Sequence, residues 1–326
     1  VFMLLRPRGS FNVNEVLRLI EEYSSKEPGY YRISDEVVLS IVKQGDVYNK
    51  NVKWVQYIFK PEQLLRSITE NPLMKRLGDL FEVSRGNTLW SYWAISHGRR
   101  PDVGGEGFFY LNEDRARQLN IPNDCLYPLL PSPDFMLFFT FNKNDWDKIR
   151  SEGHESYLFL CRKPRNELPE PALRYIQMGE GPNAIRARSG RSISETVASQ
   201  TRRRHRELFY DWYDLGGIIE TPIYVTRGVQ YWLRFVLSKF DCALDDRILA
   251  LIPKQGVSFN EDELKALLVF LNSSFTMLQA ENEGRSTGGG MLELDVRPLS
   301  SIFILDVKRL STDDIKRLAQ LFDKLD

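Results

Sequence analysis

The chain has 326 residues, enough for about two domains of ordinary size. Its 44 basic and 44 acidic side chains cancel, and its 42% hydrophobic and 27% charged fractions are those of a globular protein rather than a disordered or fibrous one. No apolar run approaches the roughly 20 residues of a membrane span, so we expect a cytoplasmic location and no membrane partner.

The first region, which ends at Asn71-Pro72, has the pattern of a small α/β unit. Its predicted elements are strands at 1–5, 30–33, 37–42 and 52–59, a helix capped by Ser10 or Asn12, and a short helix opened by Pro61.

A second unit begins at Leu77, and its mixture of short apolar runs and helical periodicity predicts a mixed sheet with peripheral helices. The predicted strands are 108–111, 135–141, 157–161, 218–226, 231–237, 247–253 and 301–305, and the predicted helices are 113–119, 172–178, 261–280 and one from Ser311. The fold class is therefore α+β, a mixed sheet domain preceded by a small α/β segment. The loop from Arg85 to Gly107 carries Arg99 and Arg100, which are secondary binding candidates.

Cysteine and histidine spacing bears on disulfides and metals. Cys125, Cys161 and Cys242 are odd in number and far apart, so we expect no disulfide framework and a reducing compartment. No histidine has another Cys or His at the offsets typical of zinc ligands, so no metal site is expected.

Arginine is concentrated between Ala184 and Arg206, a stretch that we call the arginine segment. Seven arginines stand there against one acid, Glu195, a local balance of +6 in a neutral chain. The guanidinium fork matches phosphate and the guanine edge, which favours a polyanion as the partner. The alternative is a solvated, partly disordered loop, and residues 184–199 are expected to be poorly ordered without a partner. The arginines are Arg186, Arg188, Arg191, Arg202, Arg203, Arg204 and Arg206.

A run of aromatic residues follows the arginine segment. We interpret these residues as the core that supports it, with base stacking as the alternative. Asp211, Asp214 and Glu220 are interpreted as salt-bridge partners rather than catalytic carboxylates. The aromatics are Phe209, Tyr210, Trp212, Tyr213, Tyr224, Tyr231 and Trp232.

The patterns of common catalytic sites are missing from the sequence. Amino methylation of a base uses an Asn/Asp/Ser-Pro-Pro-aromatic loop, and the chain has no Pro-Pro pair. Nucleotide-type cofactors need a glycine-rich turn between a strand and a helix, which neither Gly105-Glu106-Gly107 nor Gly179-Glu180-Gly181 supplies. The glycines at 288–290 suit either a hinge or a close approach to a ligand. We therefore expect no cofactor and no catalytic residue in this chain.

One set of motifs resembles a known family. The stretch Leu77-Gly78-Asp79-Leu80-Phe81-Glu82-Val83-Ser84-Arg85-Gly86 is similar to the opening of the C-terminal specificity domain of TaqI-like adenine-specific DNA methyltransferases of type II restriction-modification systems. Further matches occur in order along the chain, and Asn87 to Gly104 is an insertion relative to the family pattern. These matches are 107–111, 119–122, 127–133, 174–176, 212–213, 271–274, 284–285 and 288–290.

The resemblance implies a division of the chain. Residues 1–75 are expected to be the tail of a methyltransferase domain with a linker, and residues 76–326 a DNA target recognition domain. It also implies that S-adenosylmethionine and the catalytic motifs belong to a methyltransferase domain supplied in cis or in trans. The partner is then double-stranded DNA, recognised so that a target adenine is positioned for N6 methylation. The alternative is an assembly subunit of a restriction or phage-defence complex, whose arginines meet an acidic protein.

The predicted DNA contacts follow from the arginine positions. Arg186, Arg188 and Arg191 lie beside Gly190, which permits close approach to a groove, so base reading is assigned to them first. Arg202, Arg203 and Arg204 are consecutive and cannot all point one way, so at least one is expected to be structural or to bind the backbone. Arg285 joins Arg99 and Arg100 as a secondary candidate.

Overall fold

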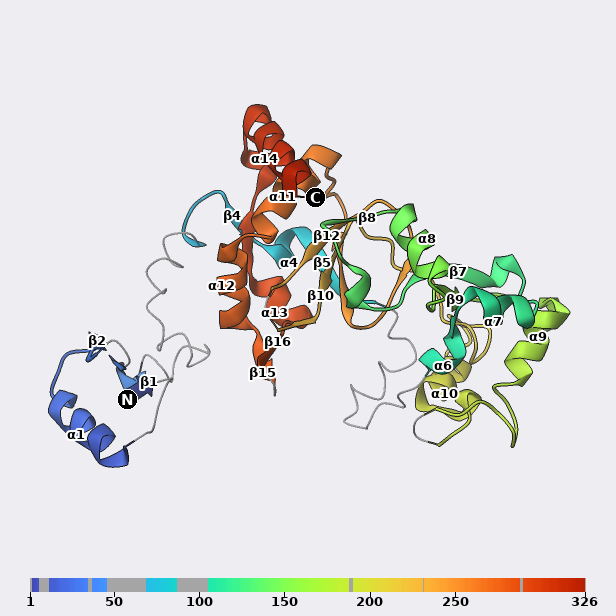
Figure 1. Cartoon of the computed structure of the whole chain (residues 1–326), viewed down its shortest axis with the longest axis horizontal. Coiled ribbons are helices and arrows are strands. Elements are labelled where there is room, and N and C mark those ends of the chain that lie inside the picture. The colour runs from blue at the N-terminus through green and yellow to red at the C-terminus, as the bar shows by residue number, and fades with distance from the viewer. Residues whose placement is uncertain are drawn as a thin grey trace.

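The computed structural model describes residues 2–5, 12–34, 37–45, 69–86, 105–187, 190–230, 232–287 and 290–325. The fold is α+β, as the sequence predicts, with a small N-terminal unit followed by two lobes (Figure 1). The predicted strand at 52–59 and the predicted helix from Pro61 lie outside the described residues.

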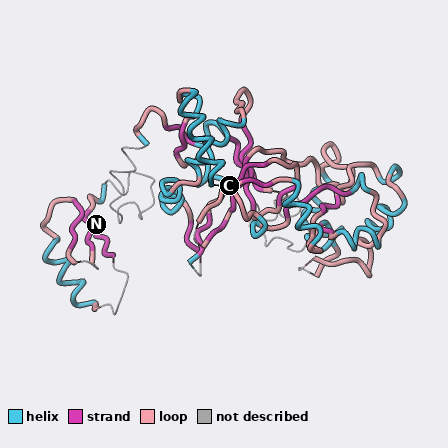
Figure 2. The backbone as a smooth tube through the Cα atoms, turned by 45° about the horizontal axis from the view of Figure 1, so that its top comes forward, coloured by secondary structure: helices cyan, strands magenta, loops and turns pink. Residues whose placement is uncertain are grey.

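The N-terminal unit is a three-stranded antiparallel sheet with one helix. β3 (Val38–Ile41) lies between β1 (Phe2–Leu5) and β2 (Gly29–Arg32). α1 (Val13–Tyr23) begins after Asn12, whose side chain accepts a hydrogen bond from the backbone N–H of Asn14 at 3.0 Å. The unit lies apart from the two lobes both in Figure 1 and in the tilted view of Figure 2.

The first lobe, which we call the sheet lobe, is built on a mixed five-stranded sheet. Its β10–β12, β10–β14 and β14–β5 pairs are antiparallel, and β12–β8 is parallel. The strands are rich in the branched and aromatic residues that suit a buried pleated surface. Their order is β5 (Phe81–Arg85), β14 (Ile248–Pro253), β10 (Ile223–Thr226), β12 (Phe235–Ser238) and β8 (Thr140–Phe141).

Helices and two small sheets complete the sheet lobe. α14 packs along α11 through Phe322, and within the described residues every helix is too short or too polar to cross a membrane. The predicted domain boundary between 75 and 76 falls inside β4, which pairs with β17. The elements are β4 (Met74–Arg76), α4 (Leu77–Leu80), β11 (Gly228–Val229), α11 (Glu261–Leu271), α12 (Ser274–Glu283), β15 (Arg285–Thr287), β16 (Met291–Glu293), α13 (Val296–Ser301), β17 (Phe303–Leu305), the 3₁₀ turn Val307–Arg309 and α14 (Thr312–Leu325).

The single helix predicted at 261–280 is wrong, because the chain forms α11 and α12 with a break at Asn272-Ser273. The Asn272 amide donates to the Phe235 carbonyl at 2.9 Å, and its oxygen accepts from the Phe235 N–H at 2.9 Å. Ser273 then caps α12. The residues at the break bond the two helices to β12. The periodicity of the apolar residues does not reveal this tertiary contact.

The second lobe, which we call the aromatic lobe, contains the four-stranded sheet β13-β7-β9-β6 surrounded by short helices. Its core gathers several of the largest buried rings among the described residues, including Trp212, Phe108 and Tyr175. The elements are α6 (Glu106–Phe109), β6 (Tyr110–Leu111), α7 (Glu113–Gln118), β7 (Leu126–Leu130), α8 (Lys143–Ser151), β9 (Tyr157–Phe159), α9 (Glu170–Gln177), α10 (Val197–Arg204), β13 (Ala243–Leu244) and the 3₁₀ turns Asn123–Cys125, Pro133–Phe135, Arg165–Glu167 and Ile193–Glu195.

Several predicted strands are shorter than expected; of the run 218–226, for example, only Ile223–Thr226 forms a strand. Residues 108 and 109 belong to a helical turn, because the N–H groups of both phenylalanines donate to the Gly105 carbonyl at 3.0 and 2.8 Å. In the run 135–141, only Thr140 and Phe141 form a strand. Leu137 and Phe138 before it are exposed by 55% and 56%.

The lobes exchange strands along their junction. β8 lies between two elements of the aromatic lobe in the sequence but joins β12 of the sheet lobe. In return, β13 leaves the sheet lobe and pairs with β7 of the aromatic lobe. A third buried cluster, with Trp146, Tyr224 and Cys242 among its members, fills the seam between the two sheets.

The expectation of no disulfide is wrong for one pair of cysteines. Cys125 and Cys161 are joined, with their Cα atoms 4.8 Å apart. Their separation in sequence hides their proximity, because β7 and β9 pair antiparallel with Leu126 opposite Phe159 and so bring the two cysteines together. Cys242 is a buried free thiol.

Candidate nucleic-acid interface

The arginine segment is folded onto the aromatic lobe rather than loosely packed. Ala187 and Ile193 are buried in the aromatic core. The backbone N–H of Ala187 donates to the Arg191 carbonyl at 2.9 Å and closes a turn at Gly190, which has a φ of +81°. The described residues 184–187 and 190–199 thus have core and backbone contacts in the fold, and poor order without a partner stays a prediction.

Arg202 belongs to the core, which corrects its assignment to the DNA surface. Its side chain is among the largest that are fully buried, and its Nη1 donates to the Trp212 carbonyl at 2.7 Å. The guanidinium carbon lies 5.7 Å from the centre of the Phe109 ring, while Nε and Nη2 have no hydrogen-bond partner. Burial lowers the pKa of Arg202 to about 9 despite the charge of Asp214. A guanidinium held there offers no surface to a duplex.

Arg203 is a clamp within the lobe. Its Nε donates to Asp211 at 3.0 Å and its Nη1 donates to the Ser194 carbonyl at 2.9 Å. Asp214 is fully buried and lies 3.5 Å from Arg162. The interpretation of Asp211 and Asp214 as salt-bridge partners is confirmed, and so is the expectation that one of the three consecutive arginines is structural.

A second layer of charge fixes the same region. Arg165 donates two hydrogen bonds to Glu180, at 2.9 and 2.6 Å, and the indole N–H of Trp212 donates to the same carboxylate at 2.8 Å. Arg165 and the Trp212 indole lower the pKa of Glu180 against the opposing effect of burial. The acidic side chains nearest the arginine segment are thus satisfied from inside the protein.

The remaining candidate arginines differ in whether their donors already have partners within the protein. Arg186 donates to the carbonyls of Gly190 at 2.7 Å and Pro182 at 3.0 Å, so part of its donor set closes its own loop. Arg191 and Arg204 are exposed. Arg285 is exposed but forms an ion pair with Glu293. The candidates Arg188, Arg99 and Arg100 lie outside the described residues.

The interpretation of the aromatic run as core is confirmed for Trp212, Tyr213 and Tyr224, which are all buried. Gly179 lies so close to Trp212 that a Cβ would meet the ring at 2.5 Å. The interpretation is wrong for Tyr210 and Trp232, which are exposed by 54% and 45%. Tyr231 lies outside the described residues.

Sequence reasoning missed Leu208, which is exposed by 63% beside Tyr210. One signal was available, because Leu208 is an isolated aliphatic residue directly after a run of charged residues. Arg206 was counted in the arginine segment without being chosen as a contact, and it too is exposed.

Buried tyrosines predict how stability depends on pH. Burial raises the pKa of Tyr175 and Tyr213 to about 12 and those of Tyr110 and Tyr224 well above the ordinary 10.0. The folded state then holds protons that the unfolded chain releases near pH 10, so stability is full below pH 10 and is lost as the pH rises towards 12. The lowered pKa of Arg202 acts in the opposite direction, but it is one group against four.

This dependence can be measured by urea unfolding at a series of alkaline pH values. The Tyr213→Phe variant removes one of the four protons, so its free energy of unfolding should fall less steeply above pH 10 than that of the parent. Identical slopes for the two proteins would contradict the assignment.

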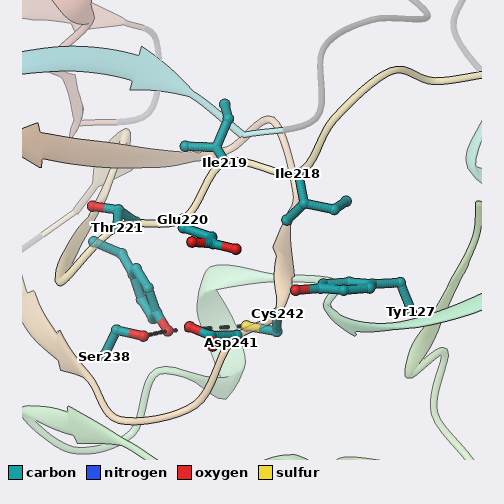
Figure 3. Close-up of a pocket in the computed structure, with 9 residues that line it drawn as sticks. Tyr127, Ile218, Ile219, Glu220, Thr221, Ser238, Asp241 and Cys242 are labelled. Carbon is teal, nitrogen blue, oxygen red and sulfur yellow. Dashed lines mark hydrogen bonds between the residues drawn. The ribbon is translucent and has the colours of Figure 1, made fainter.

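A small pocket near the seam is unsuited to DNA. It is too narrow to admit a water molecule, and Glu220 and Asp241 lie along it with Cys242 (Figure 3). The Tyr224 hydroxyl contacts the Cys242 sulfur at 3.9 Å, and burial raises the pKa of that thiol to about 12. Two carboxylates repel phosphate, and a protonated buried thiol is a poor nucleophile, so the pocket has the character of packing.

The Arg85-Gly86 turn sits at the junction of the lobes. Arg85 pairs with Asp295, and a Cβ on Gly86 would lie 2.2 Å from the Asp245 carbonyl oxygen. Asp245 is itself buried and accepts hydrogen bonds from the Tyr110 hydroxyl at 2.9 Å and Arg247 Nε at 2.6 Å. The turn is therefore fixed from both lobes.

Comparison with known proteins gives consistent matches. Residues 51–326 match the family model described as type II methyltransferase M.Eco57I, C-terminal domain. The type II methyltransferase M.AccI of Acinetobacter calcoaceticus is 22% identical over 228 residues, which are 68% of this chain and 37% of that protein. Among solved structures, the type IIG restriction endonuclease BpuSI has a similar fold, with a TM-score of 0.52 and 14% identity over 95% of this chain and 33% of that one. The chain thus spans well under half the length of either protein.

Proposed function

The chain belongs to the family of M.Eco57I-type methyltransferase C-terminal domains of restriction-modification systems, and from this premise we propose that it recognises a specific sequence in double-stranded DNA. Recognition of this sequence positions a target adenine for N6 methylation. Residues 76–326 form the target recognition domain in this proposal, and the family match is the observation that carries it.

The surface chemistry supports DNA as the partner. Arg191, Arg204 and Arg206 are exposed on one segment, while the nearby carboxylates of Asp211 and Glu180 are engaged by Arg203 and Arg165. Each of these ion pairs removes one charge of each sign, so the exposed side chains of the segment keep its net positive charge. Phosphate contacts of this kind supply the sequence-independent part of DNA affinity.

Methyl transfer is assigned to another domain. Since the chain has no Pro-Pro-aromatic motif, S-adenosylmethionine and the catalytic groups are proposed to lie in a methyltransferase domain supplied in cis or in trans. The present chain then contributes binding energy and register, and Arg186, Arg191 and Arg204 are its proposed DNA contacts among the described residues. Arg188, outside the described residues, is proposed as a contact of the same rank, and Arg99, Arg100 and Arg285 are secondary proposals.

The test is a salt titration of duplex binding by the whole chain. The dissociation constant for a labelled mixed-sequence duplex should rise by orders of magnitude between roughly 50 and 200 mM salt. The Arg191→Ala, Arg204→Ala double variant should lower the salt slope by about two. Fluorescence anisotropy gives both quantities.

A matched control removes the same charge elsewhere. Lys316 and Arg317 are exposed on α14 of the sheet lobe, so the Lys316→Ala, Arg317→Ala variant should keep the parental slope. Failure of the parent chain to bind any duplex at low salt would reject the proposed function. Binding to an acidic protein partner by a chain that binds no duplex at low salt would favour the assembly subunit.

A further inference from the structure

A turn at the end of the arginine segment presents two apolar side chains to solvent. Leu208 and Tyr210 are exposed by 63% and 54%, and Arg204 and Arg206 beside them are also exposed. Single exposed apolar residues are ordinary on protein surfaces. This pair is unusual because a rigid support and a basic border accompany it. We call residues 204–210 the wedge turn.

The backbone of the wedge turn is fixed by hydrogen bonds. The N–H groups of Leu208 and Phe209 donate to the His205 carbonyl at 3.0 and 3.1 Å. The N–H of Tyr210 donates to Asp214 Oδ2 at 3.1 Å, and Asp214 is fully buried. The two apolar side chains are therefore held out by a folded backbone.

The support beneath the turn is also held by side-chain hydrogen bonds. Arg202 reaches through the core to the Trp212 carbonyl, and Arg203 joins Asp211 to the Ser194 carbonyl. These contacts lie directly before and after the wedge turn in sequence. They fix both of its ends to the aromatic lobe, so presenting Leu208 and Tyr210 to a partner requires little additional ordering.

The charges around the turn decide which partner it suits. Arg204 and Arg206 are basic, and the one acid within the turn, Glu207, pairs with His205 Nδ1 at 2.8 Å. Asp211 and Asp214 face inward to Arg203 and to the buried backbone. Two exposed guanidinium groups bordering an aliphatic and an aromatic side chain match the phosphates and the base steps of a duplex.

We infer that the wedge turn inserts Leu208 and Tyr210 into the DNA, against a base step, while Arg204 and Arg206 hold the flanking phosphates. The inference rests on the proposed function and adds a deformation of the duplex to it. Apolar side chains that enter a base step unstack it and bend the DNA. An aromatic ring placed there stacks on an exposed base face.

The experiment compares two double variants of the whole chain. Leu208→Ala, Tyr210→Ala removes the proposed wedge, and Leu137→Ala, Phe138→Ala removes a matched aliphatic and aromatic pair of similar exposure. Affinity and salt slope for a labelled mixed-sequence duplex are measured by anisotropy, and DNA bending by energy transfer between dyes at the duplex ends.

The wedge variant should bind about 5- to 150-fold more weakly, with an unchanged salt slope and loss of the bend. The control variant should match the parent in all three quantities. Equal behaviour of both variants, or bending that survives in the wedge variant, overturns the inference while DNA binding by the parent stands. A parent chain that binds no duplex overturns the proposed function, and the wedge with it. Preference of the turn for an acidic protein over the duplex overturns the wedge alone.

Discussion

Replacing Trp212 with alanine is expected to lower the free energy of unfolding by about 3 to 5 kcal/mol. The indole is fully buried, packs at a tilt against Phe108 with the ring centres 5.2 Å apart, and donates a hydrogen bond to Glu180. Its ring also lies against Gly179, a contact that leaves no room for a β-carbon. Alanine therefore removes a large apolar group and leaves Glu180 with fewer donors.

Urea unfolding followed by circular dichroism measures this loss. Trp232→Ala is the matched control, because Trp232 is 45% exposed and its removal should cost less than about 1 kcal/mol. A similar loss in the two variants would show that Trp212 is not the centre of the aromatic lobe. DNA affinity of the Trp212→Ala protein should fall with the folded fraction, because Ala187 and Ile193 of the arginine segment are buried in the same core as this ring.

The second large effect is expected for Gly86→Ala, with a loss of about 3 kcal/mol or more, at the upper end of overpacking. The added Cβ would lie 2.2 Å from the carbonyl oxygen of Asp245 and 2.5 Å from that of Leu244. Both are backbone atoms, which cannot rotate away as a side chain can. Relief requires β5 or the connection between β13 and β14 to move.

Gly107→Ala is the control for this change. No atom of the described residues lies within 4 Å of a Cβ at Gly107, which is inside the helical turn α6, so the variant should be as stable as the parent or slightly more stable. Thermal and urea unfolding of the two variants give the comparison. A Gly86→Ala protein of parental stability would mean that the junction adapts, and that the glycine of this motif has another role.

Local pattern predicts much of this fold. Alternating and continuous apolar runs place β10 and β14 near their observed positions, and acidic residues in the first turn correctly predict α14. These signals come from residues that are neighbours in the sequence, and the structure has the elements that they predict. The break between α11 and α12 depends on a contact between Asn272 and Phe235, which are far apart in the sequence.

In the candidate interface, too, some features follow from the local sequence and others depend on the fold. The sequence locates the arginines and their aromatic support, but Arg202, Arg203 and Arg204 are chemically identical in it. Only the helix α10 decides that Arg202 turns into the core, Arg203 lies along it and Arg204 faces solvent. Exposure of Leu208 depends on the carbonyl of His205 and the carboxylate of Asp214, which set the direction of the turn.

The exchanged strands β8 and β13 limit how this scaffold can change. Lobes connected through one flexible segment rotate about a hinge, but here each lobe holds a strand of the other. The orientation of one lobe to the other is then set when the chain folds, so under the proposed function a duplex bound to the aromatic lobe would meet the sheet lobe from one direction. A change of the proposed target sequence would accordingly be confined to side chains and surface loops, since exchanging a whole lobe between relatives would leave two sheets each lacking a strand.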